Sequence, residues 1–188
     1  MTSLTLDPED MKRLLLAGLV VVVSVGLYLF QPWRLFTTVE VDEALPTGPS
    51  TTTSATTETT TKAAAEPTAK PAAGPEVLAT GAFRSHEHST SGQARVLRLS
   101  DGSRVLRIEN LRTSDGPDLR VWLSDQPVTG SWFNLDDGRW LELGELKGNK
   151  GNANYAIPAS ADLDRFTSVT IWCKRFKVSF GAASLVTA

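Results

Sequence analysis

The sequence contains one cysteine and two histidines, the side chains that most readily ligate transition metals or prosthetic groups. The cysteine is Cys173, so no disulfide can form within the chain. In an exported domain, a lone cysteine serves as a free thiol, as an intermolecular bridge or as a ligand of a prosthetic group. The alternative is a small buried hydrophobe within residues 169–173, where burial raises the thiol pKa and makes the sulfur inert. The basic neighbours Lys174, Arg175 and Lys177 favour a thiolate only if the sulfur lies near the surface.

The two histidines, His86 and His88, flank Glu87. On an extended strand, residues i and i+2 point to the same side, roughly 7 Å apart, which allows two imidazoles to share one metal. Adding Cys173 would give a His₂Cys set, which suits copper or zinc. The alternative is a surface pair on a loop, because the turn-prone residues 89–92 follow directly. We therefore predict a metal site at His86 and His88 and leave open whether Cys173 joins it.

Other catalytic signatures are missing from the sequence. The acidic residues are scattered, and no Gly-x-Ser-x-Gly elbow is present. Residues 148–152 lack the ending of a phosphate-binding loop and are predicted to form a plain connecting loop. The sequence contains no Cys-x-x-Cys-His, which excludes covalent c-type haem attachment. Residues 77–188 carry fourteen basic and twelve acidic side chains, a balance that argues against nucleic-acid binding. Whether the chain is an enzyme stays open.

The elements that must position these side chains are strands. Apolar residues in 77–188 recur mostly with a period of two, which is typical of half-buried strands. Asp101-Gly102 predicts a hairpin turn. The apolar faces in 169–173 and 176–180 are out of phase, which predicts a turn or bulge at Lys174-Arg175. The expected strands lie in residues 92–111, 119–123, 140–143, 169–173 and 176–180. Together they predict an all-β domain over 77–188, an antiparallel β-sandwich or barrel.

An apolar segment at residues 14–33 precedes this domain. It is uncharged and long enough, as a helix, to cross a bilayer, and Pro32 can end that helix. Lys12 and Arg13 precede it and only Arg34 follows closely, so the positive-inside rule places residues 1–13 in the cytoplasm. We therefore expect a single-pass anchor in the cell membrane with the C-terminal domain outside the cytoplasm. A cleaved signal peptide and a buried core helix are the alternatives.

Residues 34–76 are predicted to form a disordered stalk rich in Thr, Ala and Pro. Ten of the thirty residues in 46–75 are Thr, and large apolar side chains are missing from that stretch. Such a composition cannot bury enough apolar surface to offset the entropy of ordering. The stalk is expected to hold the folded domain away from the bilayer while keeping it tethered.

Four residue strings in the domain together resemble a known family. They are His88-Ser89-Thr90-Ser91-Gly92; Gly116-Pro117-Asp118-Leu119; Leu146 to Gly151 followed by Tyr155-Ala156-Ile157-Pro158; and Ser168 to Leu185, with Ile171-Trp172-Cys173 and Phe176 to Gly181. Their order and spacing are similar to those of the electron-transfer DM-thirteen domain family, over about residues 78–186.

The resemblance implies a β-sandwich related in style to the DOMON cytochrome-like domains, with one hallmark cysteine that Cys173 matches. It implies redox chemistry, either by a bare thiol or by a held group such as haem. The resulting hypothesis is a membrane-anchored extracytoplasmic electron-transfer module. Cys173 is its redox centre or cofactor ligand, and His88 is a second ligand or proton partner. The cofactor is undefined: haem, copper and none all stay open, and the redox or envelope partner is unknown.

Two alternatives to the redox hypothesis stay open. The first is a non-catalytic module that binds carbohydrate or protein at the cell envelope. In that case exposed aromatic side chains such as Trp132 and Trp140 would stack on a sugar face. The second is thiol-mediated dimerisation through Cys173.

Overall fold

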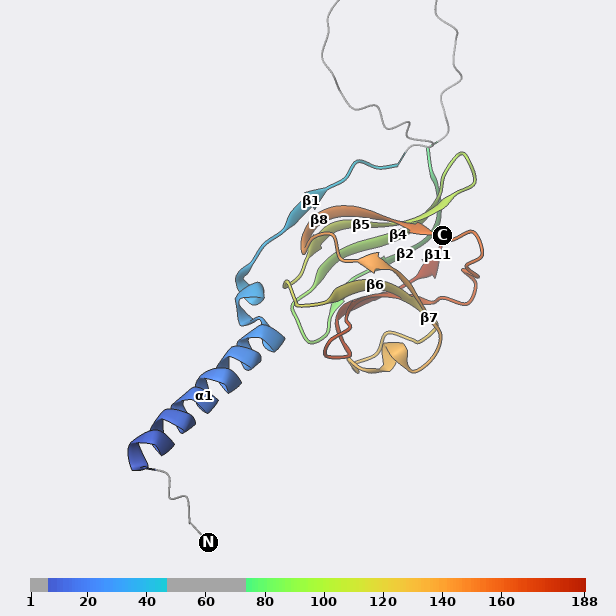
Figure 1. Ribbon diagram of the computed structural model, residues 1–188. Helices are drawn as coiled ribbons and strands as arrows, with labels where there is room; N and C mark the ends of the chain where they lie inside the picture. The colour runs from blue at the N-terminus through green and yellow to red at the C-terminus, as the bar shows by residue number, and fades with distance from the viewer. Residues whose placement is uncertain (1–6, 47–73) are drawn as a thin grey trace, which may run out of the picture.

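The computed structural model describes residues 7–46 and 74–188 (Figure 1). The chain begins with a long helix, α1 (Pro8–Phe30), and a short 3₁₀ helix, η1 (Pro32–Phe36). The strands are β1 (Glu40–Asp42), β2 (Glu76–Ala82), β3 (Arg84–Ser85), β4 (Ser91–Arg98), β5 (Arg104–Arg112), β6 (Leu119–Ser124), β7 (Trp140–Glu145), β8 (Lys150–Ile157), β9 (Ser168–Cys173), β10 (Val178–Ser184) and β11 (Val186–Thr187). A second 3₁₀ helix, η2 (Asn134–Asp136), lies between β6 and β7.

The strands form two sheets packed face to face, which confirms the predicted sandwich. One sheet has six strands in the order β1-β8-β5-β4-β2-β11, and the other has five in the order β3-β10-β9-β6-β7. All pairings are antiparallel except that of β1 with β8. The predicted hairpin at Asp101-Gly102 joins β4 to β5, and Gly102 has a φ of 81°, which favours glycine. The predicted irregularity at Lys174-Arg175 is the turn between β9 and β10.

The main core lies between the two sheets. Its buried side chains come from alternate positions of the strands, as in Leu119, Val121 and Leu123 of β6 and Val169 and Ile171 of β9. This alternation places one apolar face of each sheet inside, as the period of two predicts.

A second apolar cluster covers the outer face of the five-stranded sheet. Trp122 of β6 and Trp172 of β9 belong to it, although both strands also fill the main core. Their indole rings stack at a centroid distance of 5.0 Å, and Trp122 also stacks on Trp140 of β7 at 4.2 Å. The segment that carries η2 closes this face with the buried Leu135. Strand β9 is therefore buried on both faces.

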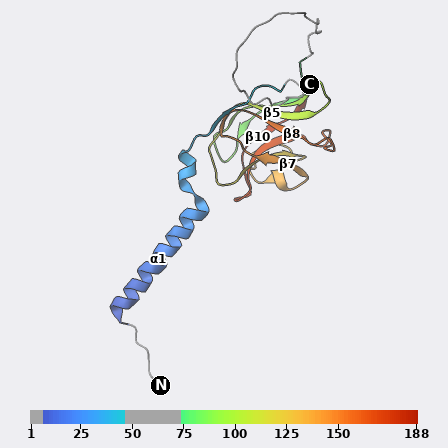
Figure 2. The same cartoon turned by 45° about the horizontal axis from the view of Figure 1, so that its top comes forward.

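Helix α1 projects away from the sandwich in both views (Figures 1 and 2). The Asp7 side chain caps its N-terminus by accepting a hydrogen bond from the Glu9 N–H, and the helix ends at Phe30, just before Pro32 as expected. None of its residues is buried, and its mean hydropathy reaches 2.3. Among the described residues, this is the one helix long and apolar enough to cross a membrane.

Strand β1 corrects the predicted stalk. Residues 34–76 were expected to be disordered, but β1 pairs in parallel with β8, with Val41 opposite Gly151. Residues 47–73 lie outside the described residues. The strands on either side of them, β1 and β2, belong to the same sheet, so the domain follows the helix after a few residues. Separation of the domain from the helix by the Thr-rich segment is therefore wrong.

The parallel pairing also corrects the loop predicted at residues 148–152, because Lys150 already begins β8. Gly151 has a φ of 105°, and a Cβ atom there would collide with the backbone carbonyl of Val41. The glycines that suggested a loop instead allow β1 to approach β8 closely.

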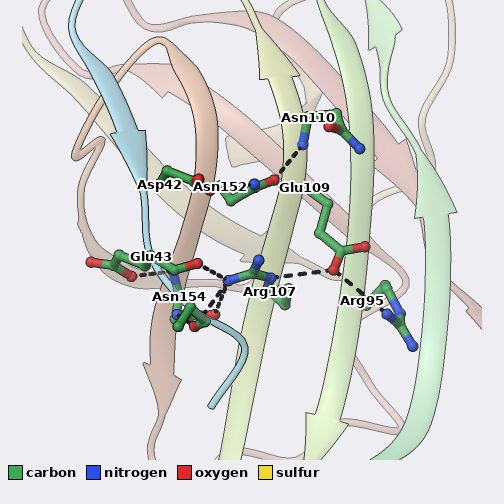
Figure 3. Close-up of polar contacts among 9 residues, drawn as sticks. Asp42, Glu43, Arg95, Arg107, Glu109, Asn110, Asn152 and Asn154 are labelled. Atoms are coloured by element: carbon green, nitrogen blue, oxygen red, sulfur yellow. Dashed lines mark hydrogen bonds and ion pairs between the residues drawn. The ribbon is translucent and has the colours of Figure 1, made fainter.

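Side chains fix the end of β1 to the sheet (Figure 3). The buried Arg107 of β5 donates hydrogen bonds to the carbonyl oxygens of Glu43 at 2.7 Å and Ala44 at 3.2 Å. The same guanidinium donates to Asn154 Oδ1 at 3.1 Å and pairs with Glu109 at 3.3 Å. Because several partners saturate this buried cation, its burial is tolerated.

Candidate functional site

Cys173 is the last residue of β9, opposite Val178 of β10 and Leu119 of β6. Its exposed fraction is 0 %, and its side chain belongs to the main core between the sheets. The sulfur therefore lies among aliphatic and aromatic side chains, next to the turn that joins β9 to β10.

Burial raises the pKa of the Cys173 thiol, because a thiolate would lose its hydration there. The backbone N–H groups of Phe176 and Arg175 in the following turn oppose this rise in pKa, whereas the carboxylates of Asp118 and Glu87 add to it. The thiol is therefore protonated at neutral pH. Its basic neighbours in sequence do not produce a thiolate in this conformation.

His86 is nine-tenths buried beside β10. Its Nδ1 atom lies 2.8 Å from Ser179 Oγ, which in turn lies 2.8 Å from Thr170 Oγ1. Its Nε2 atom is buried and has no hydrogen-bond partner among the described residues. Burial lowers the pKa of His86, with a smaller lowering from Arg84, and the backbone of Thr129 opposes it. The imidazole is therefore neutral at pH 7.

His88 is half-buried and lies over the ring of Phe180, at a centroid distance of 3.9 Å. It lines a cavity of about 320 Å³ at the junction of the sandwich and the end of α1. The cavity wall from the domain includes Phe176, Phe180 and Pro117, and the wall from the helix end includes Phe30.

Contacts between the helix end and the domain hold this junction together. Arg34 of η1 forms an ion pair with Asp115 at 3.3 Å and donates to the Gly116 carbonyl at 3.0 Å. The ring of Phe30 stacks on that of Phe176 at 5.7 Å, and Arg175 donates to the Leu29 carbonyl at 2.6 Å. The cavity is therefore enclosed by two segments that are far apart in the sequence.

The predicted site residues are brought only partly together. Residues 86–88 form a bend, not a strand, so that His86 contacts Ser179 while His88 contacts Phe180, the next residue along β10. Cys173 does not line the cavity itself, but it directly precedes the 174–177 turn, whose Phe176 does. Within residues 7–46 and 74–188, no group of three or more His, Cys, Asp or Glu side chains is placed to hold a metal ion.

Neither candidate cofactor fits the described side chains. Copper would need ligands that converge, whereas His86, His88 and Cys173 face different neighbours. A volume of about 320 Å³ lies at the lower end of the range for ligand pockets, which suits one ring better than a four-pyrrole macrocycle. We therefore derive no chemical step through haem or copper.

Sequence reasoning missed the contribution of the helix end. Phe30, Arg34 and Phe176 were not among the expected site residues, although all three line the cavity. Two signals were present: Arg34 is the first charge after the apolar segment, and Val39-Glu40-Val41-Asp42 alternates as a short strand does. Both lie beside a low-complexity tract, which obscured them.

Three of the four strings that carry the family resemblance meet at this cavity. His88 comes from the first string, Gly116 and Pro117 from the second, and Phe176 and Phe180 from the fourth. The structure thus defines a β-sandwich domain with a buried thiol and an adjoining cavity at the end of an apolar helix.

Comparison with known protein families agrees with this description. A family model described as electron transfer DM13 matches residues 82–185, which is more than half of the chain. The chain therefore belongs to the electron-transfer DM13 family, the DM-thirteen family that the sequence strings indicated. No match was found among curated proteins or among solved structures.

Proposed function

We propose that this protein is a membrane-anchored electron-transfer module whose DM13 domain faces the extracytoplasmic side. Membership of the electron-transfer DM13 family is the observation that carries the proposal. Helix α1 supports the anchor, because its apolar side chains are exposed along the whole helix and would be unstable in water. Lys12 and Arg13 before the helix support a cytoplasmic N-terminus.

The docking of β1 supports a position of the domain directly at the bilayer surface. Only nine residues separate the last residue of α1 from the first of β1, and η1 occupies five of them. A redox partner dissolved in the membrane, or bound at its surface, would thus meet the face that carries the cavity.

Cys173 is the proposed redox centre. Its sulfur is sealed and protonated in the described conformation, so that a partner reaches it only when the 174–177 turn opens. Two features support such opening: the turn is exposed, and Lys177 has a φ of 53°, an unfavourable value for a residue other than glycine. His88 lines the same cavity as Phe176, which belongs to this turn. We propose that His88 is the polar side chain beside the turn when it opens.

A mediated redox titration of the purified full chain tests this role. Glutathione is supplied as the second thiol, so that oxidation joins Cys173 to one glutathione as a mixed disulfide and passes two electrons to the mediator and two protons to water, and reduction reverses this step. We expect wild type to show this reversible couple and Cys173→Ala to lose it. Val178→Ala is the matched control, because it also removes a small side chain from the same core position across the hairpin but keeps the sulfur. An unchanged titration in Cys173→Ala would refute the thiol as the redox centre.

Protease digestion of intact and permeabilised cells tests the location. A C-terminal tag reports whether the domain is cleaved. The domain is expected to be accessible to the protease in cells whose outer barriers are opened while the inner membrane stays sealed. Protection until the membrane itself is breached would place the domain in the cytoplasm instead.

A second candidate function, recognition of an envelope carbohydrate, has one specific observation in its favour. An open groove of about 630 Å³ is lined by Trp140, Arg139, Asp162 and Arg165, and Trp140 is 44 % exposed. An exposed indole beside charged side chains is a typical platform for a sugar ring. Glycan binding that is lost in Trp140→Ala and kept in Cys173→Ala would favour this function over electron transfer.

A further inference from the structure

The cavity at the end of α1 is suited to one flat ring. Its volume is about 320 Å³, and three phenylalanine rings line it: Phe30 from the helix end and Phe176 and Phe180 from the domain. Aromatic side chains bind a planar ring by offset or edge-to-face stacking. The cavity therefore favours a ligand with a single ring over an extended chain.

Polar groups from two segments of the chain line the same cavity. Gln31 and Arg34 come from the helix end, and His88 and Glu87 come from the domain. The backbone N–H and C=O of His88 are paired with Phe180 and Thr90, but its ring makes no hydrogen bond to any residue that the structure describes. Donors from two separate segments match a ring that carries two carbonyl oxygens.

The position of the cavity limits where such a ligand comes from. Phe30 is the last residue of the apolar helix, so the cavity opens at the level of the bilayer surface if α1 spans the membrane. A ring attached to a hydrocarbon tail would enter it while the tail stays in the lipid.

We propose that this cavity binds the ring of a membrane quinone or quinol. Gln31, Arg34 and the His88 ring serve as donors to the ring oxygens, and Glu87 serves as an acceptor for a quinol hydroxyl. The inference deepens the proposed electron-transfer function by naming its partner class, and it rests on the membrane anchoring in that proposal. Phe176 connects the two sites along the chain, because it lines the cavity and belongs to the 174–177 turn that directly follows Cys173.

Binding is tested with the full chain in phosphatidylcholine nanodiscs, using decyl-ubiquinone as the ligand. Quinone retained after gel filtration is extracted and quantified, with empty nanodiscs as the partition control. We expect saturable binding of one quinone per chain, and no saturable binding of decylbenzene, which has the ring and tail without the oxygens.

Phe176→Ala is expected to weaken binding about tenfold, the usual loss for one aromatic stacking partner. Phe133→Ala is the matched control, because Phe133 is also an exposed loop phenylalanine, 60 % exposed, and does not line the cavity. His88→Ala tests the polar side. Slow alkylation of Cys173 in each variant shows that the domain is folded.

Retention equal to that of empty nanodiscs overturns the inference, as does equal affinity in wild type and Phe176→Ala. This assay involves no electron transfer and no membrane sidedness. Quinone binding without a redox transition therefore refutes the proposed function alone, and a redox transition without quinone binding refutes this inference alone.

Discussion

Arg107 is predicted to hold the segment after the anchor helix onto the sandwich. Arg107→Met removes the guanidinium but keeps an unbranched apolar side chain in its place. The carbonyl oxygens of Glu43 and Ala44 then lose their charged donor, and Glu109 keeps only Arg95, at 3.6 Å. β1 is expected to open locally while the two sheets stay intact.

The magnitude follows from the number of bonds that β1 loses. Hydrogen bonds to a charged group contribute about 1.5–3 kcal/mol each, and here two carbonyls share one cation and can be rehydrated. The free energy of local opening should therefore fall by about 2 kcal/mol, which corresponds to an opening equilibrium about 30-fold larger.

Hydrogen exchange of the Glu43 amide measures this opening, because that N–H donates to the Asn152 carbonyl at 2.9 Å only while β1 is docked. Arg104→Met is the matched control: Arg104 also lies on β5 and donates to two carbonyls, of Pro158 and Ala159, but does not touch β1. Exchange of the Glu43 amide should accelerate in the first variant only. Exchange that stays within about threefold of wild type in Arg107→Met, well short of the expected change, would refute this reasoning.

Further predictions concern the thiol, the buried histidine and the indole cluster. Alkylation of Cys173 in the native chain should be slow, and its rate should rise only at a pH above that for a free cysteine, because burial raises the pKa of the thiol. The alkylation rate of the chain unfolded in urea is the reference. Equal rates in the native and unfolded chains would contradict the buried placement of Cys173. Burial lowers the pKa of His86 below 6.5, so the unfolded chain binds more protons than the folded chain as the pH falls through 6.5. The free energy of unfolding should therefore be highest above pH 6.5 and decrease below it. Thermal unfolding measured between pH 7 and 5 should show a smaller decrease in His86→Leu than in wild type. Trp172→Ala should reduce the free energy of unfolding by about 3–5 kcal/mol. Trp140→Ala, at a position that is 44 % exposed, should cost clearly less; similar urea midpoints for the two variants would contradict the packing.

The sandwich was predictable because its signals are local. Alternation in β6 and the Asp101-Gly102 turn need only neighbouring residues to be recognised, and both are confirmed. The end of the helix before Pro32 is local in the same sense, since proline lacks the N–H that continues a helix.

The docking of β1 was not predictable from its own residues. A strand of three residues becomes stable only through its partners, which are β8 and Arg107, more than sixty residues further along the chain. The composition of the adjoining tract suggested disorder, and Gly151 suggested a loop because a strand seldom needs a positive φ.

The environment of Cys173 was equally undecidable from the sequence. Alternation identifies one buried face of β9, but the outer face is buried as well by the cluster around Trp172. The sequence around Cys173 is therefore compatible with two opposite states of the thiol. The basic neighbours favour an exposed thiolate, and the apolar residues before it favour a buried, protonated thiol. Only the three-dimensional arrangement shows the sealed thiol beside a cavity that the helix end completes.

Voltammetry of the full chain in a bilayer supported on an electrode tests the proposed function most directly, because it requires both the anchor and the redox centre. With glutathione in solution as the second thiol, we predict a reversible thiol–disulfide wave for wild type that persists in Val178→Ala and disappears in Cys173→Ala. A wild-type film without any wave, or a wave that Cys173→Ala leaves unchanged, would contradict electron transfer through this buried thiol.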